Sequence, residues 1–344
     1  MDKRSWKHLV LAPLAALLFA ALPAGAQAPE SLAGALGALS IGEPETHDGL
    51  TLIPLLSARG GDELPLLTLE KALERGWLEI VEKEGGTVPE VWLTNRSERL
   101  IFIMGGEILS GARQDRIVQR DLLVGPWRKR LSVPVFCVEQ GRWHSISKSF
   151  GSEKNLGTYK LRAKAQAAHP AAQQEIWSEV AQSNERLGVS SESGAYQDAY
   201  RDTRVAAHLQ AVEKSLLDLA LRHPEAVGVI VGCGDRIVSL DLFATRQLFQ
   251  EVWPKILKST AYACLEEGGK GRVSRKQAAE LLRELGRGAY QAREALDLGL
   301  ELLLDGPRWS ARALTHRQAL VHLAVFPQDQ DEPRGGDEEP EVLR

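Results

Sequence analysis

The sequence predicts an α+β fold, in which a mixed or antiparallel sheet is combined with helices that come mainly from the second half of the chain. Predicted strands occur in runs, and predicted helices occur in runs. The regular alternation of strand and helix that marks a parallel sheet is missing, as is a Gly-rich phosphate loop of the Rossmann or Walker type. We therefore expect no nucleotide cofactor of those types and predict no other cofactor.

The first residues have the pattern of a cleavable signal peptide. Three bases within the first seven residues precede an apolar run at residues 9–22 and small residues at 23–28. The run is shorter than the roughly 20 residues that a membrane-spanning helix needs. We expect a signal peptide at residues 1–26, cut after Ala26, with Ala28 as the alternative. The mature chain is then exported to the periplasm or the exterior and has no transmembrane segment.

The rest of the chain is predicted to be one domain with two irregular ends. Residues 27–41 are rich in Ala, Gly and Ser and are expected to be a flexible lead-in. A single α+β domain is expected at residues 42–327, followed by a disordered acidic tail at 328–344. The chain of 344 residues has a net charge of -4, which becomes -6 once the leader is removed. This charge excludes the basic footprint of a nucleic-acid-binding protein, so no nucleic-acid partner is expected.

The elements follow from hydrophobic periodicity and from capping residues. In the first half, a helix is expected at residues 67–75, opened by Thr68, and strands at 49–56, 78–83, 90–95, 100–104, 116–124 and 131–139. From residue 148 the composition becomes small and polar, and helices are expected at 160–172, 173–187 and 196–222. A hairpin of strands at 227–231 and 236–242 comes next. The remaining expected elements are a helix at 245–265 with Pro254 as a kink or break, a helix at 274–285 capped by Ser274, and strands at 300–304, 309–315 and 319–326.

Three cysteines leave an odd count, which allows one internal disulfide at most. They lack CxxC spacing, so a zinc site is not expected. Buried free thiols are the expected state of Cys233 and Cys264. His316 and His322 lie in late strands and are expected to be structural rather than ligands, so no metal site is predicted.

The first candidate functional segment is residues 105–116 (GGEILSGARQDR), where polar residues crowd after an apolar strand. A glycine pair lets backbone approach a ligand closely. Glu107 sits among apolar residues, which would raise its pKa and suit it to proton transfer. Gln114 and Arg116 follow as candidate ligand-binding residues. The alternative is a solvated polar turn at the end of a hairpin.

The second segment is residues 133–143 (VPVFCVEQGRW), where an apolar strand runs into polar residues. Arg142 can hold a phosphate or carboxylate in two hydrogen bonds, and Trp143 offers a flat face for stacking. Glu139 is a candidate acid or base, and Gln140 a ligand-binding residue. Cys137 is a candidate nucleophile, although a buried structural cysteine is the more common case.

Both segments also carry a family resemblance. Together with VGVIVGCGDRIVSLDLFATRQLFQEVWPKIL, the blocks GGE…GARQDR and CVEQGRW are similar to the bacterial ARG and Rhodanese-Phosphatase-superfamily-associated Protein domain, over residues 42–265. The resemblance implies a genomic association with ADP-ribose or NAD metabolism, and this is not a mechanism. It points to a site made of Glu107, Gln114, Arg116, Cys137, Glu139, Gln140, Arg142 and Trp143.

Two functional hypotheses follow. In the first, the two segments converge at one pocket that binds or processes a small anionic ligand, phosphorylated and of the ADP-ribose kind, with Glu107 or Glu139 as acid or base. In the second, the chain is a non-catalytic envelope module, and the polar network only holds the fold together. A third hypothesis makes Cys137 a redox or nucleophilic thiol.

Overall fold

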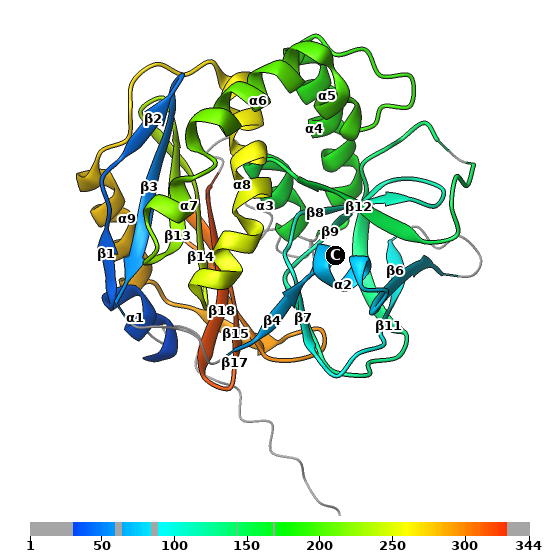
Figure 1. Ribbon diagram of the computed structural model, residues 1–344, viewed down its shortest axis with the longest axis horizontal. Helices are drawn as coiled ribbons and strands as arrows, with labels where there is room; N and C mark the ends of the chain where they lie inside the picture. The colour runs from blue at the N-terminus through cyan, green and yellow to red at the C-terminus, as the bar shows by residue number, and fades with distance from the viewer. Residues whose placement is uncertain (1–29, 59–63, 84–88, 143, 168, 329–344) are drawn as a thin grey trace, which may run out of the picture.

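A nine-stranded antiparallel sheet forms one half of the molecule in the computed structural model (Figure 1), which describes residues 30–58, 64–83, 89–142, 144–167 and 169–328. Its strands lie in the order β1-β3-β13-β14-β18-β17-β16-β15, and β2 pairs with β3. They are β1 (Leu39–Ile41), β2 (Glu45–His47), β3 (Leu50–Ser57), β13 (Ala226–Cys233), β14 (Arg236–Phe243), β15 (Gln291–Glu294), β16 (Leu300–Asp305), β17 (Trp309–His316) and β18 (Ala319–Pro327).

Two smaller sheets form the other half, which we call the small β unit (residues 66–156). One sheet has the order β10-β7-β4, with β4 and β7 parallel, and the other has the order β12-β8-β9-β11-β6-β5. The unit comprises β4 (Leu66–Thr68), α2 (Leu69–Glu74), β5 (Leu78–Glu82), β6 (Glu90–Asn95), β7 (Leu100–Ile103), β8 (Glu107–Gly111), β9 (Arg116–Val118), β10 (Leu122–Val124), β11 (Leu131–Cys137) and β12 (Phe150–Leu156). It is inserted between β3 and β13, two neighbouring strands of the large sheet.

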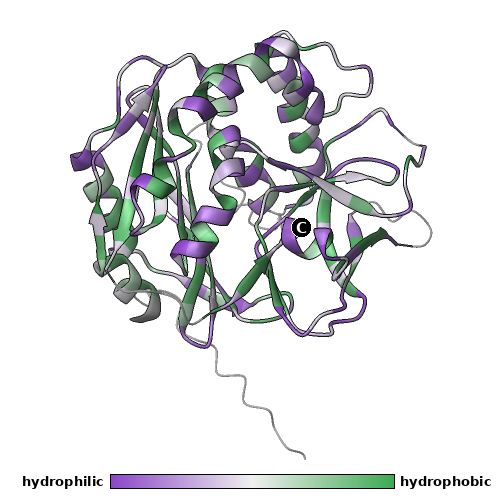
Figure 2. Ribbon diagram, viewed as in Figure 1, coloured by the Kyte–Doolittle hydropathy of each residue, from purple (hydrophilic) through white to green (hydrophobic). Residues whose placement is uncertain are grey.

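Helices cover both faces of the large sheet. One apolar core joins the sheet to α1 and α9, and another joins it to the helices that lie toward the small β unit. Strand β3 is therefore buried on both sides and is mostly apolar, with Thr51 and Ser57 as its polar residues (Figure 2). The helices are α1 (Glu30–Gly37), α3 (Tyr159–Ala167), α4 (Ala172–Leu187), α5 (Gln197–Arg201), α6 (Thr203–Leu216), α7 (Leu219–Arg222), α8 (Arg246–Glu267) and α9 (Arg275–Arg287).

The α+β prediction is confirmed, and most predicted elements are present. The hairpin β13–β14 and the last three strands form as expected. Helix α9 begins after Ser274, whose side chain accepts a hydrogen bond from the backbone of Gln277 in a capping box. Residues 1–29 and 329–344 lie outside the described part of the chain, and so do the predicted signal peptide and nearly all of the predicted acidic tail.

Two predicted elements are each divided in the structure. The single helix expected at 196–222 is α5, α6 and α7, because Asp202 has an extended conformation and caps α6 through the backbone N–H groups of Arg204 and Val205. The single strand expected at 116–124 is β9 and β10, which belong to different sheets. Asp121, between them, is buried against other elements.

Three further differences concern the lead-in, the proline of α8 and a strand that was not predicted. The lead-in expected at residues 27–41 contains α1, whose Leu32 packs in the core, and strand β1, which pairs with β3. Pro254 does not break α8, which is helical from Arg246 to Glu267. Proline removes a backbone donor and crowds the preceding turn, and here buried residues flank it on both sides, among them Trp253 and Lys255. Strand β12 was missed because its exposed residues give it a polar composition.

Candidate functional site

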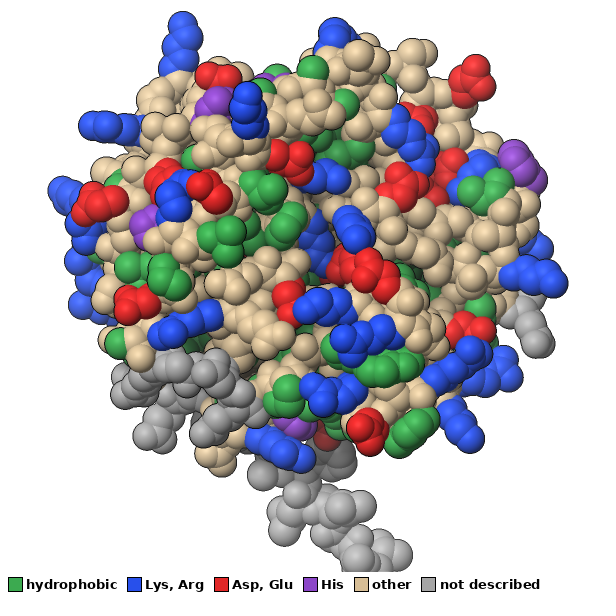
Figure 3. Space-filling model, viewed as in Figure 1, with side chains coloured by type: hydrophobic (Ala, Val, Ile, Leu, Met, Phe, Trp, Pro, Cys, Tyr) green, Lys and Arg blue, Asp and Glu red, His purple; other side chains and the backbone are tan. Residues whose placement is uncertain are grey.

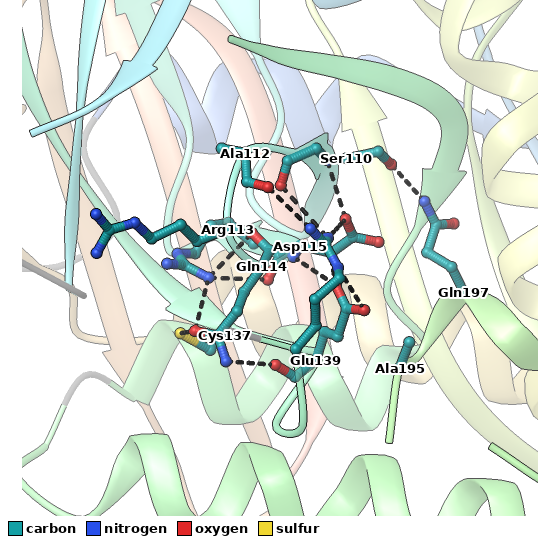
Figure 4. Close-up of polar contacts among 12 residues, drawn as sticks. Ser110, Ala112, Arg113, Gln114, Asp115, Cys137, Glu139, Ala195 and Gln197 are labelled. Atoms are coloured by element: carbon teal, nitrogen blue, oxygen red, sulfur yellow. Dashed lines mark hydrogen bonds and ion pairs between the residues drawn. The ribbon is translucent and has the colours of Figure 1, made fainter. Parts of the chain in front are cut away.

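The two predicted segments meet at the end of the pair β9–β11. This pair is antiparallel and places Arg116 opposite Cys137. Residues just before β9 therefore lie beside residues just after β11. Figure 4 shows the outcome: the Gln114 side chain donates to the backbone oxygen of Glu139 at 2.8 Å, and the backbone N–H of Asp115 donates to the Glu139 carboxylate at 3.1 Å.

Arg142 is the centre of this arrangement. Its Nε and Nη2 atoms donate to the two carboxylate oxygens of Glu139, at 2.8 and 2.5 Å. Nη1 donates to the backbone oxygen of Ala112 at 2.8 Å, and Nη2 also lies 3.2 Å from the Asp115 carboxylate. The Arg142 side chain is 10% exposed. We call Gln114, Asp115, Glu139 and Arg142 the Arg142 network.

The two carboxyl groups of the network differ in their pKa. Burial alone would raise the pKa of Glu139, but hydrogen bonds from Arg142 and from the Asp115 backbone outweigh burial and lower it. The pKa of Asp115 is raised to about 6, mainly by burial and further by the negative charge of Glu139, which outweigh the hydrogen bond from the Gly111 backbone and the charge of Arg142. The network therefore contains one firmly ionised carboxylate and one that titrates in mildly acidic solution.

Cys137 is the free cysteine of the described residues and is fully buried at the end of β11. Its thiol donates to the side-chain oxygen of Gln114 at 3.3 Å. Gln173 of α4 exchanges two hydrogen bonds of 2.9 Å with the Cys137 backbone. Burial raises the pKa of the thiol to about 11, so it stays protonated at neutral pH.

The remaining predicted residues are placed differently. Arg116 is buried, and its Nη1 donates to the backbone oxygen of Gln114 at 3.0 Å. Gln140 is exposed and takes part through its backbone oxygen. Trp143 lies outside the described residues.

Glu107 takes its side-chain partner from another element. It opens β8, and its Oε1 atom accepts a hydrogen bond of 2.6 Å from Lys255 of α8. Lys255 also binds both carboxylate oxygens of Glu70 on α2, at 2.9 and 3.0 Å. Burial, reinforced by the nearby Glu70, raises the pKa of Glu107 to about 8. The expected raised pKa is thus present, in a cluster that joins α2, α8 and β8.

Sequence reasoning missed a third buried polar cluster, centred on Asp241 of β14. Arg162 of α3 binds this carboxylate through two nitrogens, at 3.1 and 2.6 Å. His322 of β18 lies between two carboxylates, 2.6 Å from Asp121 and 3.2 Å from Asp241. A carboxylate in the apolar strand sequence VSLDLF was the available signal, because an ionised side chain in such a setting needs a partner.

The glycine pair of the first segment supports this third cluster. The backbone N–H of Gly105 donates to Asp121 at 2.7 Å, and its backbone oxygen accepts from Arg162 at 3.3 Å. Gly106 has a φ of +98°, and a Cβ atom there would lie 2.4 Å from the Cγ atom of Arg162. Both glycines therefore serve close packing on Arg162 and Asp121, where the sequence analysis expected approach to a ligand.

The prediction of free thiols at Cys233 and Cys264 is wrong. These two residues form a disulfide that joins β13 to α8, with their Cα atoms 5.2 Å apart. Both lie on facing elements of one core, so their side chains meet although 31 residues separate them.

A cavity of about 100 Å³ lies between α3 and the large sheet. Lys160, Lys164 and Arg312 line it, together with Glu175 and Asp305. Its charges are therefore mixed. In the described part of the chain, no group of His, Cys, Asp and Glu residues is arranged to hold a metal ion.

Comparison with known proteins identifies a family. The family model of the ARG and Rhodanese-Phosphatase-superfamily-associated Protein domain matches residues 38–326. The chain belongs to this family. No curated protein and no solved structure gives a significant match.

Proposed function

We propose that this member of the family is an exported interaction module in which the Arg142 network stabilises the fold. The observation that carries the proposal is the state of Arg142. Each of its three guanidinium nitrogens donates to an acceptor of the protein itself, and the side chain is largely buried. An arginine that recognises a phosphate needs two N–H groups directed at the ligand.

Electrostatics also disfavours an anion at this position. A ligand that displaced Glu139 from Arg142 would leave two carboxylates, Glu139 and Asp115, beside its own negative charge. Repulsion between like charges at such distances is costly in a buried setting. The ligand-processing hypothesis therefore has weaker support from the geometry than the structural hypothesis.

Cys137 has weak support as a nucleophile. A thiol acts as a nucleophile through its thiolate, and burial disfavours that form here. Its neighbour in the network is the amide of Gln114, which accepts the thiol proton in a hydrogen bond and is not a base.

Export is supported by the disulfide. Disulfides form and persist in oxidising compartments and are rare in the cytosol. The bond between Cys233 and Cys264 is therefore in keeping with a signal peptide at residues 1–26. Among the described residues, no helix has the length and apolar character to cross a membrane.

Alanine substitution at Arg142 tests the structural role. We expect Arg142→Ala to lower the free energy of unfolding by about 3 kcal/mol, because Glu139 and Asp115 are left buried without their cation. For a domain of this size the melting temperature should fall by about 6 °C. Thermal denaturation followed by circular dichroism measures both.

Arg113→Ala is the matched control. Arg113 lies in the same segment, but its side chain is 53% exposed, so the melting temperature should stay within about 1 °C of wild type. An Arg142→Ala protein that melts like this control would contradict the structural role. That result would favour the ligand-binding hypothesis, in which the Arg142 network does not contribute to the stability of the fold.

A further inference from the structure

Two neighbouring loops of the small β unit form an exposed tip that is rich in arginine and lysine. One is the β6–β7 turn with Arg96 and Arg99, and the other is the β10–β11 loop with Trp127, Arg128, Lys129 and Arg130. We call these six residues the basic tip. The loops lie at the lower edge of the small β unit in Figure 1.

Hydrogen bonds hold the two loops together. The backbone N–H of Trp127 donates to the Ser97 backbone oxygen at 2.9 Å, and that of Asn95 donates to the Arg128 backbone oxygen at 2.8 Å. The buried side chain of Asn95 bridges the backbone oxygens of Arg99 and Gly125, both at 2.8 Å. The side chains of the tip are therefore displayed on a fixed backbone.

Trp127 is the exposed aromatic residue of the tip. Its side chain belongs to the large apolar side chains left outside the core, and the residue is 64% exposed. Its φ is +53°, and that of Arg130 is +46°, both in the left-handed region that non-glycine residues rarely adopt. Sparsely populated backbone conformations cluster at functional sites, and here two of them occur in one loop, one of them at an exposed aromatic residue.

The charge of the tip opposes that of the protein. The two loops hold five bases and one exposed acid, Glu98. Arg96 also pairs with Glu79 of β5 at 2.5 Å, and the Arg130 guanidinium lies 5.1 Å from the ring centroid of Trp92. Asp297 lies behind the tip, where it is buried and binds Arg128 at 2.9 Å. The mature chain has a net charge of -6, so the sign of the tip is opposite to that of the chain as a whole. Figure 3 shows several Lys and Arg side chains on the lower part of this face, in the region of the small β unit, and others along its left edge and at its top.

We propose that the basic tip docks on an anionic phospholipid surface. Lysine and arginine near such a surface attract its headgroups, and tryptophan prefers the interface between headgroups and acyl chains. The tip combines two loops, joined by backbone hydrogen bonds, with one exposed aromatic residue among the bases. This inference rests on the export part of the proposed function, since an exported chain faces the outer side of a membrane, and it names the partner of the module.

Vesicle sedimentation tests the proposal with the mature chain, residues 27–344. We expect binding to vesicles that contain phosphatidylglycerol and not to vesicles of pure phosphatidylcholine, and release as salt shortens the screening length. The double substitution Lys129→Glu and Arg130→Glu should weaken binding by about 30-fold or more, the loss of two basic contacts. Trp127→Phe should abolish fluorescence quenching by brominated acyl chains while the charge-driven binding persists.

The control places the same charge change elsewhere. Lys276→Glu with Arg283→Glu alters two exposed bases of α9, at the opposite side of the molecule in Figure 1, and should leave binding unchanged. Equal loss in both double variants would overturn the proposal, because it would indicate net charge alone. Absence of vesicle binding would also overturn it, as would binding to soluble heparin or an oligonucleotide in place of vesicles. All tip variants should have the melting temperature of wild type. A loss of vesicle binding can therefore be distinguished from a failure of the Arg142 test, which measures the melting temperature.

Discussion

His322 is fully enclosed, with one carboxylate at each ring nitrogen. Burial disfavours its charged form, but Asp121 and Asp241 outweigh burial and raise its pKa to about 8. A folded-state pKa above the unfolded value means that the stabilisation is complete below about pH 6.5 and is lost as pH rises through about 8. The raised pKa of Glu107 acts in the same direction, because the folded state holds a proton that the unfolded state releases; its effect begins near pH 4.5 and ends as pH rises through about 8.

We therefore expect the free energy of unfolding to fall between pH 6.5 and 8.5. His322 alone should account for about 2 kcal/mol of this change. Urea denaturation across this pH range measures it. His322→Gln should make the free energy of unfolding depend less steeply on pH. Glu107→Gln should remove the part of the pH dependence that comes from Glu107 and keep the part that comes from His322. Stability that stays constant or rises across this range would contradict the assignment of both groups.

The environment of a single side chain could be predicted where neighbouring residues in the sequence determine it. An apolar neighbourhood indicated a raised pKa for Glu107, and the structure agrees in direction. Its partner Lys255 is 148 residues away, and no local pattern could reveal it. The same holds for Arg162 and Asp241, which come from α3 and β14. Buried ion pairs are thus the part of the candidate site that sequence reasoning leaves open.

At the scale of elements, the disulfide links α8 covalently to β13 of the large sheet. It closes a loop between residues 31 apart in the chain. We expect the double variant Cys233→Ala and Cys264→Ala to lose about 3 kcal/mol of stability, since the bond restricts the unfolded chain. Urea denaturation measures the loss. Cys137→Ala, which leaves the disulfide intact, is the control for removal of a buried cysteine.

The number of free thiols per chain tests both the disulfide and the export of the protein. Protein expressed with its own leader and recovered from the periplasm should show one thiol per chain after denaturation, from Cys137. The native protein should react slowly, because that thiol is buried and protonated. Three thiols after denaturation would contradict the disulfide, and fast reaction of the native protein would revive the nucleophile hypothesis.

Periodicity and capping predicted most elements, and tertiary contacts explain the errors. Ser274 and its capping box were readable because the signal lies within four residues. The helix expected at 196–222 has apolar spacing throughout, yet Asp202 interrupts it with a local cap. The strand expected at 116–124 is divided because its two halves pair in different sheets, which periodicity along one segment does not encode.

At the scale of the whole molecule, the small β unit is an insertion into the large sheet. The chain leaves after β3 and returns to pair β13 with β3, so the sheet order cannot be obtained from local patterns. Three buried polar clusters lie where the unit meets the rest of the protein: the Arg142 network with Gln173, the Glu107–Lys255 pair and the Arg162–Asp241 pair. Both segments selected from the sequence contribute to these contacts, which explains why their polar residues interrupt apolar strands.

Removal of Arg162 should weaken the attachment of the small β unit. Its side chain is 2% exposed and connects Asp241 of the large sheet to the backbone of Gly105. We expect Arg162→Ala to cost about 3–5 kcal/mol, because Asp241 keeps His322 but loses its permanent cation. Hydrogen exchange should then rise in β8 and β10 before it rises in β13 and β14, because the unit has an apolar core of its own and can separate from the sheet.

Arg201→Ala is the matched control for this prediction. Arg201 of α5 also pairs with the small β unit, through Glu153 of β12, but both side chains are well exposed. Its loss should cost less than about 1 kcal/mol and leave the exchange pattern unchanged. If exchange in Arg162→Ala instead rises equally in all strands, the two halves unfold as one cooperative unit, and the buried clusters would act on the whole core rather than on the attachment of the insertion.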